Sequence, residues 1–177
     1  MSHLARPRIV VSRCLGFEAC RWDGQSIACP AIDLLRGLVD FHPLCPEMDI
    51  GLGVPRLPIN IVRLDDGERL LQSETGADLS MTMRDYAART LAALGEVDGF
   101  ILKSRSPSCG LGDVKLYADS SDSAAVVGRT SGLFAAAALA RFPDLPIENE
   151  ECLADPARRE RFIERIRALA AHRRVNR

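Results

Sequence analysis

Three short runs of β-prone apolar residues constrain the fold of this chain more than any other feature. Each run is followed closely by a cysteine. The runs are residues 8–12, 38–44 and 100–103, and the cysteines that follow them are Cys14, Cys45 and Cys109. Runs of this length and composition are typical of buried strands. The sequence therefore predicts three strands whose carboxyl ends each lead to a thiol.

Apolar residues at helical spacing separate these strands and continue after them. The spacing predicts helices over 30–38, 82–94 and 132–141, with Ser131 as the N-cap of the third, and a C-terminal amphipathic helix over 155–173. Alternating strands and helices predict an α/β fold, with a mainly parallel, Rossmann-like sheet flanked by helices in a single domain over residues 1–177. The runs 57–64 and 69–72 flank an Asp-Asp-Gly-Glu turn and predict a small β-hairpin excursion, and residues 124–127 predict one more short strand.

In open parallel sheets, ligands bind beyond the carboxyl ends of the strands, where the strand order reverses. We expect such a topology to bring Cys14, Cys45 and Cys109 to one crevice, although they are far apart in the sequence. No compact C-x-x-C pair is present, so neither a zinc-ribbon nor a ferredoxin spacing can be drawn. The residues alone leave three roles open for these cysteines: packed thiols, ligands or a nucleophile.

Composition narrows the class of protein. The 177 residues carry a net charge of −1, which gives no global field that attracts nucleic acid. No apolar run approaches the roughly 18 residues that a membrane span needs, and the N-terminus lacks a signal-peptide core. We expect a cytoplasmic protein with reduced thiols. The remaining cysteines, Cys20, Cys29 and Cys152, are expected to be packed or incidentally exposed thiols. Cys20, which lies six residues after Cys14, is nevertheless close enough to approach the same site.

Four stretches together carry a family resemblance: VSRCLGFEACRWDG, PLCPE, KSRSPSCG and VVGRTSGLFAAAALARFPDLPIENEE, in that order. They resemble the small iron-sulfur desulfidases typified by thiouracil desulfidase, many of which have long been described only as a domain of unknown function. The resemblance runs from about Ile9 to Glu151. Any one of these motifs is weak by itself, and their joint occurrence in order is specific.

The resemblance implies a [4Fe-4S] cluster held by Cys14, Cys45 and Cys109, with the fourth iron open to the sulfur of a substrate. The catalytic acid residue and serine of the family match Glu47 and Ser106 in this sequence. The implied reaction is the non-redox desulfuration of a small thiolated base, such as 2-thiouracil, with release of sulfide. The resemblance requires no cysteine at the position of Cys20.

Several alternatives stand beside this interpretation. The three cysteines and His42 are a possible zinc set for a structural or regulatory module, and Cys109 is a candidate nucleophile of a thiol enzyme. A desulfidase acting on thiolated tRNA is a further alternative, because the C-terminal helix is rich in arginine. Larger relatives with an added domain are thought to use that substrate. We expect no such domain in this chain and no nucleic-acid partner. Without the resemblance, Glu47 is a surface carboxylate and Ser106 a turn cap.

Overall fold

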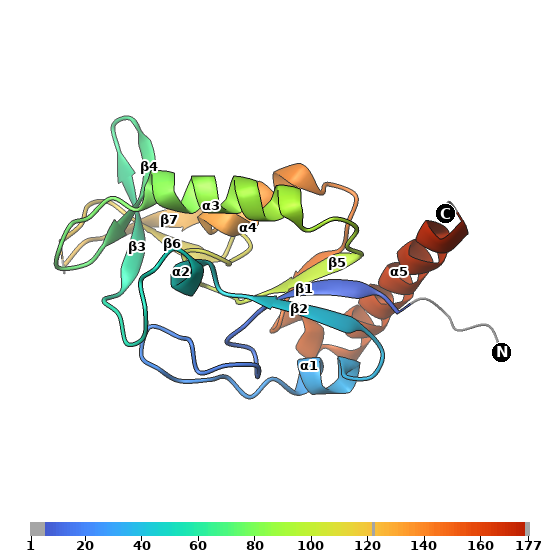
Figure 1. Cartoon of the computed structure of the whole chain (residues 1–177). Helices are drawn as coiled ribbons and strands as arrows, with labels where there is room; N and C mark the ends of the chain where they lie inside the picture. Colours follow the sequence, from blue (N-terminus) through green and yellow to red (C-terminus); the bar gives the residue numbers. More distant parts are fainter. Residues whose placement is uncertain (1–5, 122, 176–177) are drawn as a thin grey trace.

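The runs that precede the three cysteines form one parallel sheet in the computed structural model of the chain, which describes residues 6–121 and 123–175. This sheet contains β1 (Arg8–Ser12), β2 (Asp40–Leu44), β5 (Gly99–Leu102) and β8 (Ile147–Asn149) in the order β2-β1-β5-β8. Each neighbouring pair is parallel, and Figure 1 shows β2, β1 and β5 side by side. The predicted parallel sheet is confirmed, and β8, which was not predicted, adds its fourth strand.

A second sheet contains the predicted hairpin. Its strands are β3 (Ile59–Leu64), β4 (Gly67–Gln72), β6 (Val114–Tyr117) and β7 (Val126–Thr130), in the order β4-β3-β6-β7. The pair β3–β4 is the antiparallel hairpin expected from the sequence. It is larger than a simple excursion, because β6 joins β3 in parallel and β7 joins β6 in antiparallel orientation. The strand expected at 124–127 begins two residues later.

Five α-helices complete the described fold: α1 (Pro30–Leu35), α2 (Pro46–Asp49), α3 (Ser80–Ala93), α4 (Leu133–Arg141) and α5 (Pro156–Val175), with a short 3-10 turn at Cys152–Ala154. The first helix ends three residues earlier than predicted, because Gly37 has a φ of +86° and the chain turns there into β2. None of the described helices is long and apolar enough to cross a membrane.

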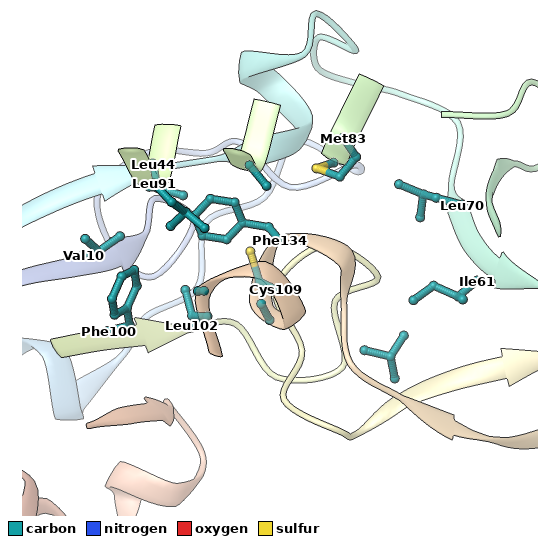
Figure 2. Close-up of a cluster of buried hydrophobic side chains, with 14 of the residues drawn as sticks. Val10, Leu44, Ile61, Leu70, Met83, Leu91, Phe100, Leu102, Cys109 and Phe134 are labelled. Atoms are coloured by element: carbon teal, nitrogen blue, oxygen red, sulfur yellow. The ribbon is translucent and has the colours of Figure 1, made fainter. Parts of the chain in front are cut away.

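The alternation of side chains along the central strands divides the core into two layers. Ile9 and Val11 of β1 pack with buried residues of α1 and α5, whereas Val10 between them packs with α3 and α4. In Figure 1, α3 and α1 lie on opposite sides of this sheet. Figure 2 shows the layer beneath α3 and α4, which includes Phe134 and also Cys109. One of the three predicted site cysteines therefore borders this layer.

The first turn of α4 binds the loop that carries Cys109. The carbonyl of Ser108 accepts hydrogen bonds from the amides of Phe134 and Ala135 at 3.0 and 3.1 Å. The Ser108 carbonyl therefore accepts from the first amides of α4, which would otherwise need a side-chain N-cap as their acceptor. The prediction that Ser131 caps this helix is therefore wrong: the N-cap is Gly132, and the Ser131 hydroxyl accepts instead from the amide of Gly112 at 3.0 Å.

Gly132 is required where α4 meets this loop, for steric reasons alone. A Cβ at this position would lie 2.4 Å from the carbonyl carbon of Ser108 and 2.6 Å from the amide nitrogen of Cys109. We expect Gly132→Ala to lower the free energy of unfolding by about 1–3 kcal/mol, because backbone must move to admit the methyl group. Urea denaturation measures this change.

Gly128 supplies the matched control, because its nearest neighbour to an added Cβ is a Leu116 methyl at 3.9 Å. Gly128→Ala should leave stability unchanged within about 0.5 kcal/mol. If Gly132→Ala lowered the free energy of unfolding no more than Gly128→Ala does, the backbone contact between α4 and the Cys109 loop would not be tight.

Candidate functional site

The order of the central sheet creates a crevice at one edge. From β1 the chain proceeds to β2 on one side, and β5 pairs with β1 on the other, so the strand order reverses at β1. All three strands end at the same edge because they are parallel and in close register, with Ser12 opposite Leu44 and Val11 opposite Ile101. The loops that follow these strands begin side by side, as the general rule for ligand sites in such sheets requires.

A pocket of about 280 Å³ lies at this edge, and the three predicted site cysteines all line it. Cys20 lines it as well, whereas Cys29 is buried in the neighbouring core and Cys152 is partly exposed elsewhere. The other lining residues that matter for its chemistry are Ser12, Trp22, Glu47, Arg56, Lys103 and Ser106. The structure thus brings together Cys14, Cys45, Cys109, Glu47 and Ser106.

Burial controls the protonation of the pocket thiols. Burial, followed by the neighbouring Cys45, raises the pKa of Cys14 to about 12, and burial likewise raises the pKa of Cys45. Burial raises the pKa of Cys109 well above its ordinary value, against a hydrogen bond with Ser12 that lowers it. A thiol in this state is a weak nucleophile, which disfavours the thiol-enzyme alternative for Cys109. Thiolates at these positions need a positive partner such as a metal.

A buried ion pair holds the predicted catalytic carboxylate. The Arg56 Nε and Nη2 atoms each lie 2.7 Å from Oε2 of Glu47, and the exposed fractions of the two side chains are only 4% and 11%. The other oxygen, Oε1, accepts a hydrogen bond from the Ser108 hydroxyl at 3.0 Å. Both carboxylate oxygens are therefore engaged, and the Glu47 side chain joins α2 to the loop that carries Cys109.

Arg56 also connects the surrounding loops. Its Nη2 donates to the carbonyl of Cys20 at 3.1 Å and its Nη1 to the carbonyl of Gly53 at 2.9 Å. One guanidinium therefore ties the Cys20 loop, the Cys45-Pro-Glu47 turn and the loop after α2 to each other. Neither Arg56 nor Ser108 was identified from the sequence, since Arg56 lies in an irregular segment without any motif.

Ser106 performs the local role of a turn cap. Its Oγ accepts hydrogen bonds from the amides of Ser108 and Cys109 at 3.2 and 3.1 Å, which folds the Ser-Pro-Ser-Cys segment back on itself. Ser106 nevertheless lines the pocket and is only half-buried. Because its oxygen is the acceptor in both bonds, the hydroxyl hydrogen is available for donation.

A second ion pair borders the pocket where β5 and β8 end. Lys103 Nζ contacts Glu150 Oε1 at 2.5 Å, and the Ser104 amide and hydroxyl also donate to Glu150, at 2.8 and 2.7 Å. Burial acts to raise the pKa of Glu150, but the hydrogen bonds with Lys103 and Ser104 outweigh it and the pKa is lowered. Glu150 is thus held as a carboxylate that fixes Lys103 at the pocket wall.

The zinc alternative finds little support in the positions of its residues. His42 is exposed on β2 and does not line the pocket. Within residues 6–121 and 123–175, no three side chains of His, Cys, Asp or Glu close on a position for a single metal ion. Cys109 interacts electrostatically with both Cys14 and Cys45, so the three thiols are neighbours in this pocket.

The fold and the pocket define a class: an α/β protein with a thiol-lined site at the carboxyl edge of a parallel sheet. The sequence profile of the 2-thiouracil desulfurase family matches residues 9–150, and the chain belongs to this family. A solved structure of a [4Fe-4S]-dependent thiouracil desulfidase, TudS, is similar, with a TM-score of 0.60 and 28% sequence identity. The similarity covers 86% of this chain and 96% of TudS. The uncharacterized protein YbbK of Bacillus subtilis strain 168 is 36% identical over an alignment of 114 residues, and the match covers 59% of this chain and 74% of YbbK.

The buried pair of Arg56 and Glu47 gives a prediction for stability. Arg56→Met leaves a buried carboxylate without its counter-ion, so we expect the free energy of unfolding to fall by about 3–5 kcal/mol. In the double variant Glu47→Gln/Arg56→Met the uncompensated charge is absent, and the loss should be smaller than in Arg56→Met alone. Urea denaturation of the iron-free proteins measures both values.

Arg158 provides a control, because its contact with Glu148 is 3.4 Å long and the Arg158 side chain is 46% exposed. Arg158→Met should change stability by at most about 1 kcal/mol. If the double variant lost as much stability as Arg56→Met, the two side chains would not be coupled.

Proposed function

We propose that this protein removes sulfur from a small thiolated pyrimidine, such as 2-thiouracil, and releases it as sulfide. In this proposal Cys14, Cys45 and Cys109 hold a [4Fe-4S] cluster. The observation that carries the proposal is the meeting of these three thiols with Glu47 in one pocket of a chain from the 2-thiouracil desulfurase family. The structural likeness to a [4Fe-4S]-dependent thiouracil desulfidase supports it.

The donor set fits such a cluster. Thiolates are soft ligands suited to iron, and three of them leave one iron without a protein ligand. When bound, the cluster supplies an iron that accepts a sulfur ligand and draws electron density from the C–S bond. The reaction exchanges sulfur for oxygen, R₂C=S + H₂O → R₂C=O + H₂S, so no electron is gained or lost overall.

In this proposal, residues of the chain accept the proton of the attacking water and donate a hydrogen bond to the substrate. Glu47 is the acceptor for the proton of the attacking water, and Arg56 and Ser108 fix the direction of its carboxylate. Ser106 contributes the hydrogen of its hydroxyl to the substrate at the pocket wall. Arg56 is thus a positioning residue for Glu47.

Trp22 favours a planar substrate. Its side chain is 47% exposed and lines the pocket, so an indole face is available for stacking on an incoming ring. We infer that the substrate is a free thiolated base, with thiolated tRNA as the alternative that an assay distinguishes. The chemistry also needs reduced thiols, which is why we place the protein in the cytoplasm.

The first test is anaerobic purification with analysis of iron and sulfide, followed by measurement of sulfide released from 2-thiouracil and from thiolated tRNA. We expect about four irons per chain, because the proposed cluster contains four. We expect each of the variants Cys14→Ser, Cys45→Ser and Cys109→Ser to lose cluster binding, because a hydroxyl is a poor ligand for this group.

Cys29→Ser is the control for the cysteine variants, since Cys29 is buried but does not line the pocket. It should retain iron and turnover. A colourless wild-type protein that takes up no iron on reconstitution would refute the proposal, and release of sulfide from tRNA alone would replace the free base as substrate.

The proposed roles of Glu47 and Ser106 make a second test. Glu47→Gln keeps the contact with Ser108 but cannot take a proton, so kcat per bound cluster should fall by about 100-fold or more. Ser106→Ala should lower it by about tenfold, the equivalent of one lost hydrogen bond. Steady-state assays with iron content measured in parallel give both numbers.

Glu148→Gln removes a carboxylate that lies outside this pocket and should leave kcat unchanged. Full turnover by Glu47→Gln or by Ser106→Ala, at unchanged cluster content, would remove that residue from the mechanism.

A further inference from the structure

Two side chains of the pocket contact the sulfurs of proposed cluster ligands without serving as ligands themselves. A hydrogen bond with Cys20 acts to lower the pKa of the Cys45 thiol, and a hydrogen bond with Ser12 acts to lower the pKa of the Cys109 thiol, although burial raises both pKa values overall. Both residues line the pocket, and both are almost completely buried, with exposed fractions of 1% for Cys20 and 2% for Ser12. Neither has a part in the chemistry described above.

The surrounding backbone fixes Cys20 against Cys45. The Cys20 carbonyl accepts from Arg56 at 3.1 Å, and its amide donates to the carbonyl of Glu18 at 2.9 Å. The Cys45 sulfur lies 3.9 Å from the same Cys20 carbonyl. Because the main chain of Cys20 is held from both sides, the close approach of the two side chains is a property of the fold.

Ser12 is held in a comparable way. Its Oγ accepts a hydrogen bond from the amide of Lys103 at 2.9 Å, which links the ends of β1 and β5. A hydroxyl has a single hydrogen to donate. The Lys103 amide uses only a lone pair of the Ser12 oxygen, so the hydroxyl hydrogen of Ser12 is available for the Cys109 sulfur. The contact therefore has a defined donor, Ser12, and a defined acceptor, Cys109.

We propose that Ser12 and Cys20 donate hydrogen bonds to the ligand sulfurs of Cys109 and Cys45, and that Cys20 is a hydrogen-bond donor and not a fourth ligand. This inference rests on the proposed function. Hydrogen bonds to ligand sulfurs withdraw negative charge from an iron-sulfur cluster, which raises its reduction potential. The same withdrawal makes the open iron a better acceptor for the sulfur of a substrate.

The test uses the cluster-loaded protein and does not depend on turnover. The midpoint potential is measured by an optical redox titration of wild type, Ser12→Ala and Cys20→Ala. The dissociation constant for sulfide added to each oxidised protein is followed by absorbance. We expect both variants to have lower potentials and to bind sulfide about tenfold more weakly, as the loss of one charge-assisted hydrogen bond implies. Ser12→Thr and Cys20→Ser keep a donor and should recover towards wild type.

Cys29→Ala is the matched control, because it removes a buried thiol from the same core layer without touching the pocket. Its potential should equal that of wild type. If an alanine variant loses the fold, Ser12→Val and Cys20→Val fill the same space without a donor and should give the same lower potentials.

The outcomes separate this inference from the proposed function. Loaded variants with unchanged potentials would overturn the inference and leave the proposed function intact. A Mössbauer spectrum in which Cys20→Ala changes the signal of one distinct iron would identify Cys20 as a ligand and also overturn it. A wild-type protein that binds no cluster would overturn the proposed function, and the inference with it.

Discussion

The parallel pairing of β1 with β2 and with β5 is the constraint on which the rest of the site depends. Parallel strands in register end at one edge, so the chain leaves all three strands at neighbouring points. The strand order also reverses at β1, and the pocket lies there. The cysteines that follow these strands lie close together because the backbone hydrogen bonds of the sheet place their loops side by side.

A sheet edge places loops near each other but does not fix their side chains, and Arg56 performs this second task. Burial of a guanidinium and a carboxylate costs desolvation free energy. A buried ion pair therefore need not make the fold more stable than an apolar pair of the same size would. The pair instead fixes the orientation of the Glu47 carboxylate in the pocket. Arg56 contacts both Glu47 and the carbonyl of Cys20, and Glu47 reaches Ser108 next to Cys109. The network therefore spans the neighbourhoods of two pocket cysteines.

Much of this arrangement was predictable from the sequence, because β1, β2 and β5 are short, mostly apolar, β-prone runs and the helix periodicity between them is regular. The strand β8 was missed because it has only three residues. The strand β6 was missed because its four residues alternate between buried and more exposed positions and form no continuous apolar run. The helix α2, with four residues, is too short to show a period. Ser131 was assigned as a cap by local chemistry, and the tertiary contact of α4 with the Ser108 carbonyl replaced it. Arg56 lies in a loop and has no local signal, so only the folded chain reveals its partners.

The pocket thiols are divided between the two core layers of the molecule. Cys109 belongs to the layer under α3 and α4, whereas Cys14, Cys20 and Cys45 belong to the layer packed against α1 and α5. The central sheet separates these layers, and the pocket at its edge is where they come into contact. A group bound to thiols from both layers would gain its full binding energy only when the layers are correctly joined, so its binding energy becomes folding energy. Binding of such a group and folding of the chain would then be coupled, so that occupancy of the site and the free energy of unfolding rise together.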